Sequence, residues 1–122
     1  MQQPSKISSH TDLSVWQISM NIVVDIYKVT ALFPTDERFG LISQMRRAAI
    51  SIPSNIAEGR RQGTRREFRR FLTIAFGSGA ELETQIEISK RLGYKHDPKI
   101  DQQLNTLMRM LNSFIHSLDS LE

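Results

Sequence analysis

Residues Gln44 to Gly59, QMRRAAISIPSNIAEG, combine helical periodicity with an interior proline and a closing glycine. Apolar residues recur in steps of three and four from Met45 to Ile56, which predicts an amphipathic helix with one buried face. Pro53 removes one backbone hydrogen bond from this helix, and Asn55 falls at the edge of the buried face. Because a buried amide needs hydrogen-bonding partners, we expect Pro53 and Asn55 to serve the fold, with ligand binding by Asn55 as the alternative.

Local signals place three more helices around this one. Phe33-Pro34 ends a helix that begins near residue 12, because proline disfavours helical geometry in the residue before it. Thr64-Arg65-Arg66-Glu67 matches a capping box, in which threonine and glutamate satisfy each other's backbone N–H groups. Asp97-Pro98 begins the last helix. Caps of the first two helices are expected at Thr11 or Asp12 and at Thr35.

The predicted architecture is all-α. Helices are expected over about 12–32, 36–60, 65–92 and 98–120, joined by short connections and without any strand signal. This pattern predicts a single-domain, up-down-up-down antiparallel four-helix bundle over residues 11–122, preceded by a flexible tail over residues 1–10.

The first predicted helix is apolar over most of its circumference, which indicates burial on more than one side. We assign one stripe to the core (Leu13, Trp16, Met20, Val23 and Tyr27) and a polar stripe to solvent (Gln17, Asn21, Asp25 and Lys28). The second apolar stripe, together with isoleucines outside the core stripes of later helices, is expected to contact another copy of the chain. The residues predicted for this subunit interface are Val15, Ile18, Ile22, Ile50, Ile74 and Ile88.

Gly77 and Gly79 fall in the middle of the third predicted helix. Each glycine costs roughly 1 kcal/mol relative to alanine at such a position, so we expect them to permit close approach of another backbone. A phosphate-binding glycine loop is the poorer alternative, because no strand precedes it and no Gly-Lys-Ser sequence follows.

Charge is distributed unevenly along the 122 residues. The net charge is +3, yet the segment from Arg38 to Arg70 holds nine arginines against only Glu58 and Glu67. The guanidinium group of arginine suits the recognition of phosphate and carboxylate groups, so this charge indicates either an acidic partner or a solvated helical face, and composition favours neither. No apolar run approaches the roughly 18 residues of a membrane span, and the polar N-terminus lacks the apolar core of a signal peptide. We therefore expect a cytoplasmic protein without a membrane partner.

Residue patterns typical of catalysis are missing from the sequence. The chain has no cysteine, and none of its three histidines, His10, His96 and His116, has a second histidine at ligand spacing. Glu83 and Glu87 share a helix face, but a solvated charge row explains them better than a metal site. We therefore expect no catalytic residues, no metal, no cofactor and no enzymatic activity.

The arginines carry the functional hypothesis. Cations spaced along a surface supply the phosphate contacts that dominate affinity for nucleic acids. The predicted nucleic-acid-binding residues are Arg46, Arg47, Arg60, Arg61, Arg65, Arg66, Arg69 and Arg70. The favoured interpretation is a non-enzymatic, oligomeric nucleic-acid-binding or ribonucleoprotein accessory protein that contacts the phosphate backbone. The alternative is a protein–protein adaptor whose arginines bind an acidic protein partner.

Several short motifs resemble a known family. They are Arg47-Ala48-Ala49, Ser51-Ile52-Pro53, Asn55-Ile56-Ala57-Glu58-Gly59, Gly77-Ser78 and Glu81-Leu82-Glu83, with Val15-Trp16-Gln17, Phe33-Pro34 and Phe39-Gly40-Leu41 upstream. Over about residues 11 to 95 the chain resembles the bacterial four-helix-bundle proteins encoded in intervening sequences of 23S ribosomal RNA genes. The resemblance implies a homo-pentamer similar to the accessory protein of diversity-generating retroelements, which binds reverse transcriptase and nucleic acid through a basic surface. RNA, DNA and a protein such as a reverse transcriptase are therefore the expected partners.

Overall fold

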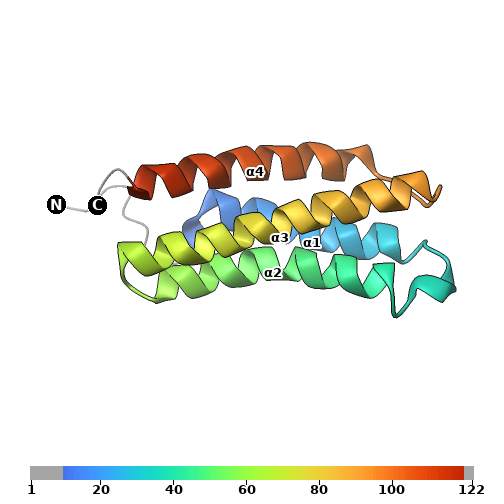
Figure 1. The fold of residues 1–122 in the computed structure, drawn as a ribbon, viewed down its shortest axis with the longest axis horizontal. Helices are drawn as coiled ribbons and strands as arrows, with labels where there is room; N and C mark the ends of the chain where they lie inside the picture. Colours follow the sequence, from blue (N-terminus) through green and yellow to red (C-terminus); the bar gives the residue numbers. More distant parts are fainter. Residues whose placement is uncertain (1–9, 120–122) are drawn as a thin grey trace.

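The computed structural model describes residues 10–119 and shows a bundle of four long helices (Figure 1). They are α1 (Ser14–Thr30), α2 (Leu41–Arg61), α3 (Arg65–Arg91) and α4 (Pro98–Asp119), with short 3-10 helices η1 (His10–Asp12) and η2 (Thr35–Glu37). The described residues contain no strand. The predicted all-α four-helix bundle is confirmed. Of the tail predicted over residues 1–10, all but His10 lies outside the described residues.

The helices pack in chain order around a common core. Each helix contacts the next one along the chain, and α1 also contacts α4, whereas the diagonal pairs α1 with α3 and α2 with α4 do not pack together within the described part. The edge formed by α2 and α3 is therefore opposite the edge formed by α1 and α4. The α2–α3 connection lies at the same end as the start of α1 and the end of α4, and the other two connections lie at the far end (Figure 1).

Two helix starts differ from their predicted positions. Thr11 and Asp12 belong to η1, and α1 begins after Leu13 without a side-chain cap. Thr35 begins η2, and α2 starts only at Leu41. There the Glu37 carboxylate accepts a hydrogen bond from the Leu41 N–H at 3.1 Å. By contrast, the Thr64 side chain accepts from the Glu67 N–H at 3.1 Å, as the capping box predicted for the start of α3.

The burial of α1 corrects the assignment of its stripes. Val15 and Ile22 are only 3% and 0% exposed and lie in the core of this chain, so each has almost no surface to offer a second subunit. Met20 and Tyr27, assigned to the core, are exposed. Asp25, assigned to the solvated stripe, is buried and lies 3.4 Å from the ammonium group of Lys99. Both apolar stripes have helical spacing, and only the positions of α2 and α4 decide which one is buried.

The glycines also differ in their roles from the prediction. Gly59 lies inside α2 rather than at its end, and a Cβ atom there would lie 2.6 Å from the Phe71 Cβ and 3.3 Å from the Phe68 carbonyl oxygen. This is where α2 and α3 approach most tightly around a glycine. Gly79 leaves room for the Met108 side chain of α4 rather than for a backbone. Gly77 is exposed, and a Cβ atom there would contact nothing.

Pro53 is buried within α2, and Asn55 lies one half-turn beyond it. The Asn55 amide donates to the Ser51 carbonyl oxygen at 2.8 Å and to the Ser51 hydroxyl at 2.9 Å. The Ser51 hydroxyl in turn lies 2.8 Å from the Ser78 hydroxyl of α3. The amide therefore belongs to a hydrogen-bonded chain that joins α2 to α3.

Candidate functional site

Six arginines gather at one end of the bundle. Arg60 and Arg61 occupy the last turn of α2, Arg65 and Arg66 the first turn of α3, and Arg69 and Arg70 the next turn. Gly63, with φ of 84°, makes the turn between the helices in a conformation that favours glycine. We call residues 60–70 the arginine end. It lies beside the end of α4, at the left of Figure 1.

Two of these arginines hold neighbouring parts of the chain. The Arg69 guanidinium binds the Asp119 carboxylate through two contacts, Nε to Oδ1 at 2.7 Å and Nη2 to Oδ2 at 3.0 Å, which ties α3 to the end of α4. Arg70 lies 3.1 Å from Glu67 and 4.4 Å above the ring centre of Phe71. Their charges are partly neutralised within the chain.

Three others point into solvent. Arg61, Arg65 and Arg66 are exposed, and among the residues that the structure describes none of them forms an ion pair. A shallow hollow of about 210 Å³ adjoins Arg65 and is lined by Gly59, Arg60, Gly63, Thr64, Arg65, Phe68 and Leu118. The positive end of the α3 dipole points towards this hollow, and a helix N-terminus favours bound anions. Charge, exposure and dipole thus combine to attract negatively charged groups.

The aromatic side chains at the arginine end are held by contacts within the chain. The Phe68 ring packs edge-on against Phe114 of α4, with ring centres 5.3 Å apart. Phe71 lies beneath Arg70 and beside Gly59. Since neither ring is free to stack on a base, the arginine end is suited to contacts with phosphate groups rather than to base recognition.

Arg46 and Arg47, also predicted to bind nucleic acid, lie further along α2. The Arg46 Nε donates to the Thr30 hydroxyl at 2.9 Å and its Nη2 to the Tyr27 carbonyl oxygen at 3.2 Å. Its guanidinium also lies 4.3 Å above the Tyr27 ring, so it joins α2 to the last turn of α1. Arg47 is exposed but precedes Arg61 by four helical turns, roughly 20 Å along α2. The structure does not bring either residue to the arginine end.

The isoleucines predicted for a subunit interface divide into two groups. Ile50, Ile74 and Ile88 are exposed, at 41%, 40% and 44%, and Ile18 is partly buried against the core. Other large apolar residues are also exposed: Met20 and Tyr27, which the periodicity assigned to the core, and Val24, Leu32, Phe39 and Leu92. Large apolar side chains therefore remain on the surface of the single chain at several places.

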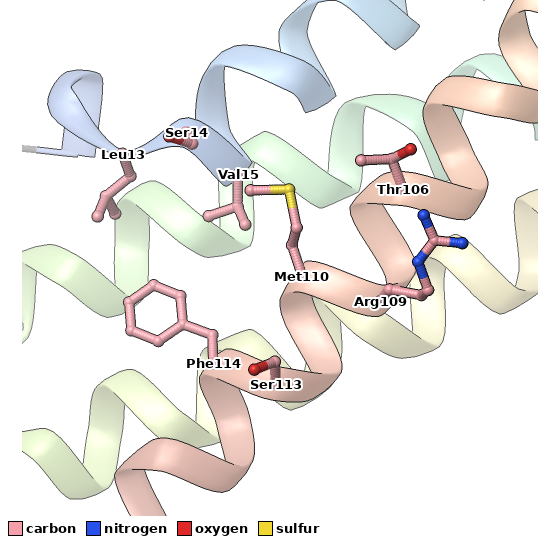
Figure 2. A pocket seen from close by; sticks show the side chains of 8 residues that line it. All are labelled: Leu13, Ser14, Val15, Thr106, Arg109, Met110, Ser113 and Phe114. Atoms are coloured by element: carbon pink, nitrogen blue, oxygen red, sulfur yellow. The ribbon is translucent and has the colours of Figure 1, made fainter.

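An open groove of about 540 Å³ lies between the start of α1 and the second half of α4. Figure 2 shows its lining residues: Leu13, Ser14, Val15, Thr106, Arg109, Met110, Ser113 and Phe114. We call it the α1–α4 groove. No local signal predicts it, because its two walls are about ninety residues apart in the sequence.

The described residues give little support to a metal site or a membrane span. Within residues 10–119, no cluster of three histidine, aspartate or glutamate side chains is placed to hold a metal ion. His96 instead lies 3.0 Å from Asp101, which also contacts Lys90 at 3.1 Å. None of the described helices is long and apolar enough to cross a membrane.

Comparisons with known proteins give a family match and a similar solved structure. Residues 11–113 match the sequence model of the family described as 23S rRNA-intervening sequence protein. The bundle is also similar to the crystal structure of a protein with unknown function from the S23 ribosomal protein family of Bacteroides thetaiotaomicron VPI-5482. That similarity has a TM-score of 0.73 and 26% sequence identity, and it covers 84% of this chain and 95% of the other. No curated protein matches this chain.

Proposed function

We propose that this chain, which belongs to the family of 23S rRNA-intervening sequence proteins, is a non-enzymatic RNA-binding accessory protein. In this proposal it works as a homo-oligomer. The arginine end binds the RNA phosphate backbone. The observation that carries the proposal is the group of exposed cations Arg61, Arg65 and Arg66 beside the N-terminus of α3, none of which forms an ion pair within the described residues. The homo-oligomer is a pentamer in this proposal, as the family resemblance implies.

The mode of binding follows from the side chains present. Each arginine that neutralises a phosphate releases a counterion, so affinity falls with salt by a slope of about −0.7 per contact on single-stranded RNA. Three arginines in one chain therefore give a slope of roughly −2, a weak interaction for one subunit. Several copies acting on one RNA raise the affinity by avidity.

The test compares two triple charge reversals. Arg61→Glu, Arg65→Glu and Arg66→Glu remove the exposed cations of the arginine end that form no ion pair within the described residues. The control reverses Lys28, Arg38 and Lys95, which are exposed at the far end of the bundle and produce the same change in net charge. Fluorescence anisotropy with a labelled single-stranded RNA is measured over a series of salt concentrations.

We expect the first variant to lose RNA binding and the control to retain most of it, with circular dichroism unchanged in both. Equal loss in both variants would mean that net charge rather than the arginine end is responsible. No binding of the wild type at low salt would refute the proposal. Capture of one acidic protein that survives nuclease treatment and needs Arg61, Arg65 and Arg66 would instead establish the adaptor function.

A further inference from the structure

The lining of the α1–α4 groove changes from apolar at one end to polar and cationic at the other. Leu13 and Phe114 form one end, Thr106 and Arg109 lie at the other, and Val15 and Met110 are between them (Figure 2). Within the described residues, Arg109 forms no ion pair. The groove therefore offers an apolar end and an unneutralised cation along one helix, which suits a helix that carries an apolar side chain and a carboxylate.

This chain carries such a stripe on the outer face of α3. Ile74, Gly77, Glu81 and Ile88 are all exposed there at helical spacing. Ile74 and Glu81 flank Ser78, whose hydroxyl bonds with α2, so the stripe lies towards the α2–α3 edge. Glu81 accepts only a long hydrogen bond of 3.3 Å from Gln85. Gly77 has open space where its side chain would be, which allows another helix to approach closely.

The stripe and the groove lie at the same height along the bundle. The Arg69–Asp119 ion pair fixes the relative height of the antiparallel helices α3 and α4. Ile74 is five residues after Arg69, and Phe114 is five residues before Asp119, so these two side chains are level. The contact of Gly79 with Met108 gives a second reference for the heights of α3 and α4. Measured from this contact, Glu81 and Arg109 are offset along the bundle axis by three residues, about 4.5 Å.

We propose that the Ile74–Glu81 stripe of one copy docks in the α1–α4 groove of the next copy, an inference that rests on the homo-oligomer of the proposed function. Ile74 packs against Phe114 at the apolar end of the groove, and Glu81 pairs with Arg109. The two surfaces lie on opposite edges of the bundle, so the contact is head-to-tail rather than two-fold. Because stripe and groove are level, successive copies need little axial shift, and a rotation between them that divides the full circle evenly closes the ring of the proposed homo-oligomer.

Charge exchange tests the pairing. Arg109→Glu and Glu81→Arg each place like charges opposite one another, and the double variant carrying both restores opposite charges. We expect light scattering without RNA to give the mass of one chain, 14.0 kDa, for each single variant and the wild-type multimer for the double variant. Glu83→Arg is the matched control, since Glu83 is exposed on the same helix outside the stripe. It should leave the mass unchanged.

Cysteine cross-linking tests the head-to-tail geometry in a chain that has no cysteine of its own. Ser113→Cys marks the groove and Gly77→Cys marks the stripe. With a short bifunctional maleimide, neither variant should cross-link alone, their mixture should give a covalent dimer, and a chain with both substitutions should give a ladder of multimers. Dimers formed by either single variant alone would show a two-fold contact and overturn the proposal.

The remaining outcomes separate this inference from the proposed function. A multimer that survives both Arg109→Glu and Glu81→Arg overturns the pairing and leaves the oligomer intact. A wild-type chain with the mass of one chain overturns both the pairing and the oligomer, while arginine-dependent RNA binding is judged by its own assay. A one-chain mass that rises only when residues 1–9 are deleted would place that segment in the groove and also overturn the pairing.

Discussion

One substitution, glycine to alanine, should have opposite effects at two positions of this bundle. At Gly59 a new Cβ atom would lie 2.6 Å from the Phe71 Cβ and 3.3 Å from the Phe68 carbonyl oxygen. Neither atom can move by a side-chain rotation, so the helices α2 and α3 must separate. At Gly77 the new atom would contact nothing.

The magnitudes follow from two terms. Alanine is favoured over glycine inside a helix by about 1 kcal/mol at both positions. Overpacking a close contact costs typically 1–3 kcal/mol, and the Gly59 contact falls at the upper end because it involves backbone atoms. We therefore expect Gly59→Ala to lower the free energy of unfolding by about 1–2 kcal/mol and Gly77→Ala to raise it by about 1 kcal/mol. Gly79→Ala should lie between them, because the flexible Met108 thioether can move aside.

Urea unfolding followed by circular dichroism measures these differences. Each variant is unfolded at two protein concentrations, so that a change in subunit association is separated from a change in the fold. If Gly59→Ala were as stable as the wild type, the close approach of α2 and α3 would not be the reason for glycine at this position. Equal effects of Gly59→Ala and Gly77→Ala would refute the reasoning from Cβ contacts altogether.

Two contacts between helices and loops give further predictions. A hydrogen bond from the Tyr94 hydroxyl at 2.7 Å, and then one from the backbone at the start of α2, lower the pKa of Glu37. A carboxylate whose pKa is lowered by folding stabilises the folded state above its unfolded pKa, near 4.5, and this stabilisation is lost as the pH falls through its folded pKa. Tyr94→Phe should therefore lower the free energy of unfolding, measured in urea, by less at acidic pH than at neutral pH. Separately, Arg46→Ala should cost about 1–2 kcal/mol in the same assay, because it leaves the Thr30 hydroxyl and the Tyr27 carbonyl without a charged donor. Arg46→Lys should recover only part of this stability, because lysine lacks the planar fork.

Features set by neighbouring residues in the chain were predictable. The Thr64–Glu67 cap depends on atoms three residues apart, and the structure shows the predicted bond from the Glu67 N–H. Its reciprocal half is absent from the hydrogen bonds of the described residues, since Glu67 contacts Arg70 instead. Helix number and order likewise follow from periodicity and breakers, which are local signals.

Features set by the relative placement of helices were not predictable. Val15 and Met20 both lie on apolar stripes of α1, and only the packed bundle shows that Val15 is buried and Met20 exposed. Arg46 looks like its neighbour Arg47 in the sequence, yet only Arg46 reaches the last turn of α1. Gly59 resembles a helix stop until the approach of Phe71 is known. In each case the partner is distant along the chain.

The arginine end and the proposed ring together predict how affinity depends on RNA length. Copies related by rotation without axial shift all point the same way, so every arginine end lies on one rim of the ring. An RNA long enough to reach neighbouring subunits should therefore bind much more tightly than one that covers a single patch, because the second contact is intramolecular. Arg109→Glu, which lies away from the arginine end, should abolish this gain with length while short RNAs still bind. The measurement is anisotropy with a series of RNAs of increasing length. If affinity still increased with RNA length in a monomeric Arg109→Glu variant, the increase would not come from neighbouring subunits of a ring.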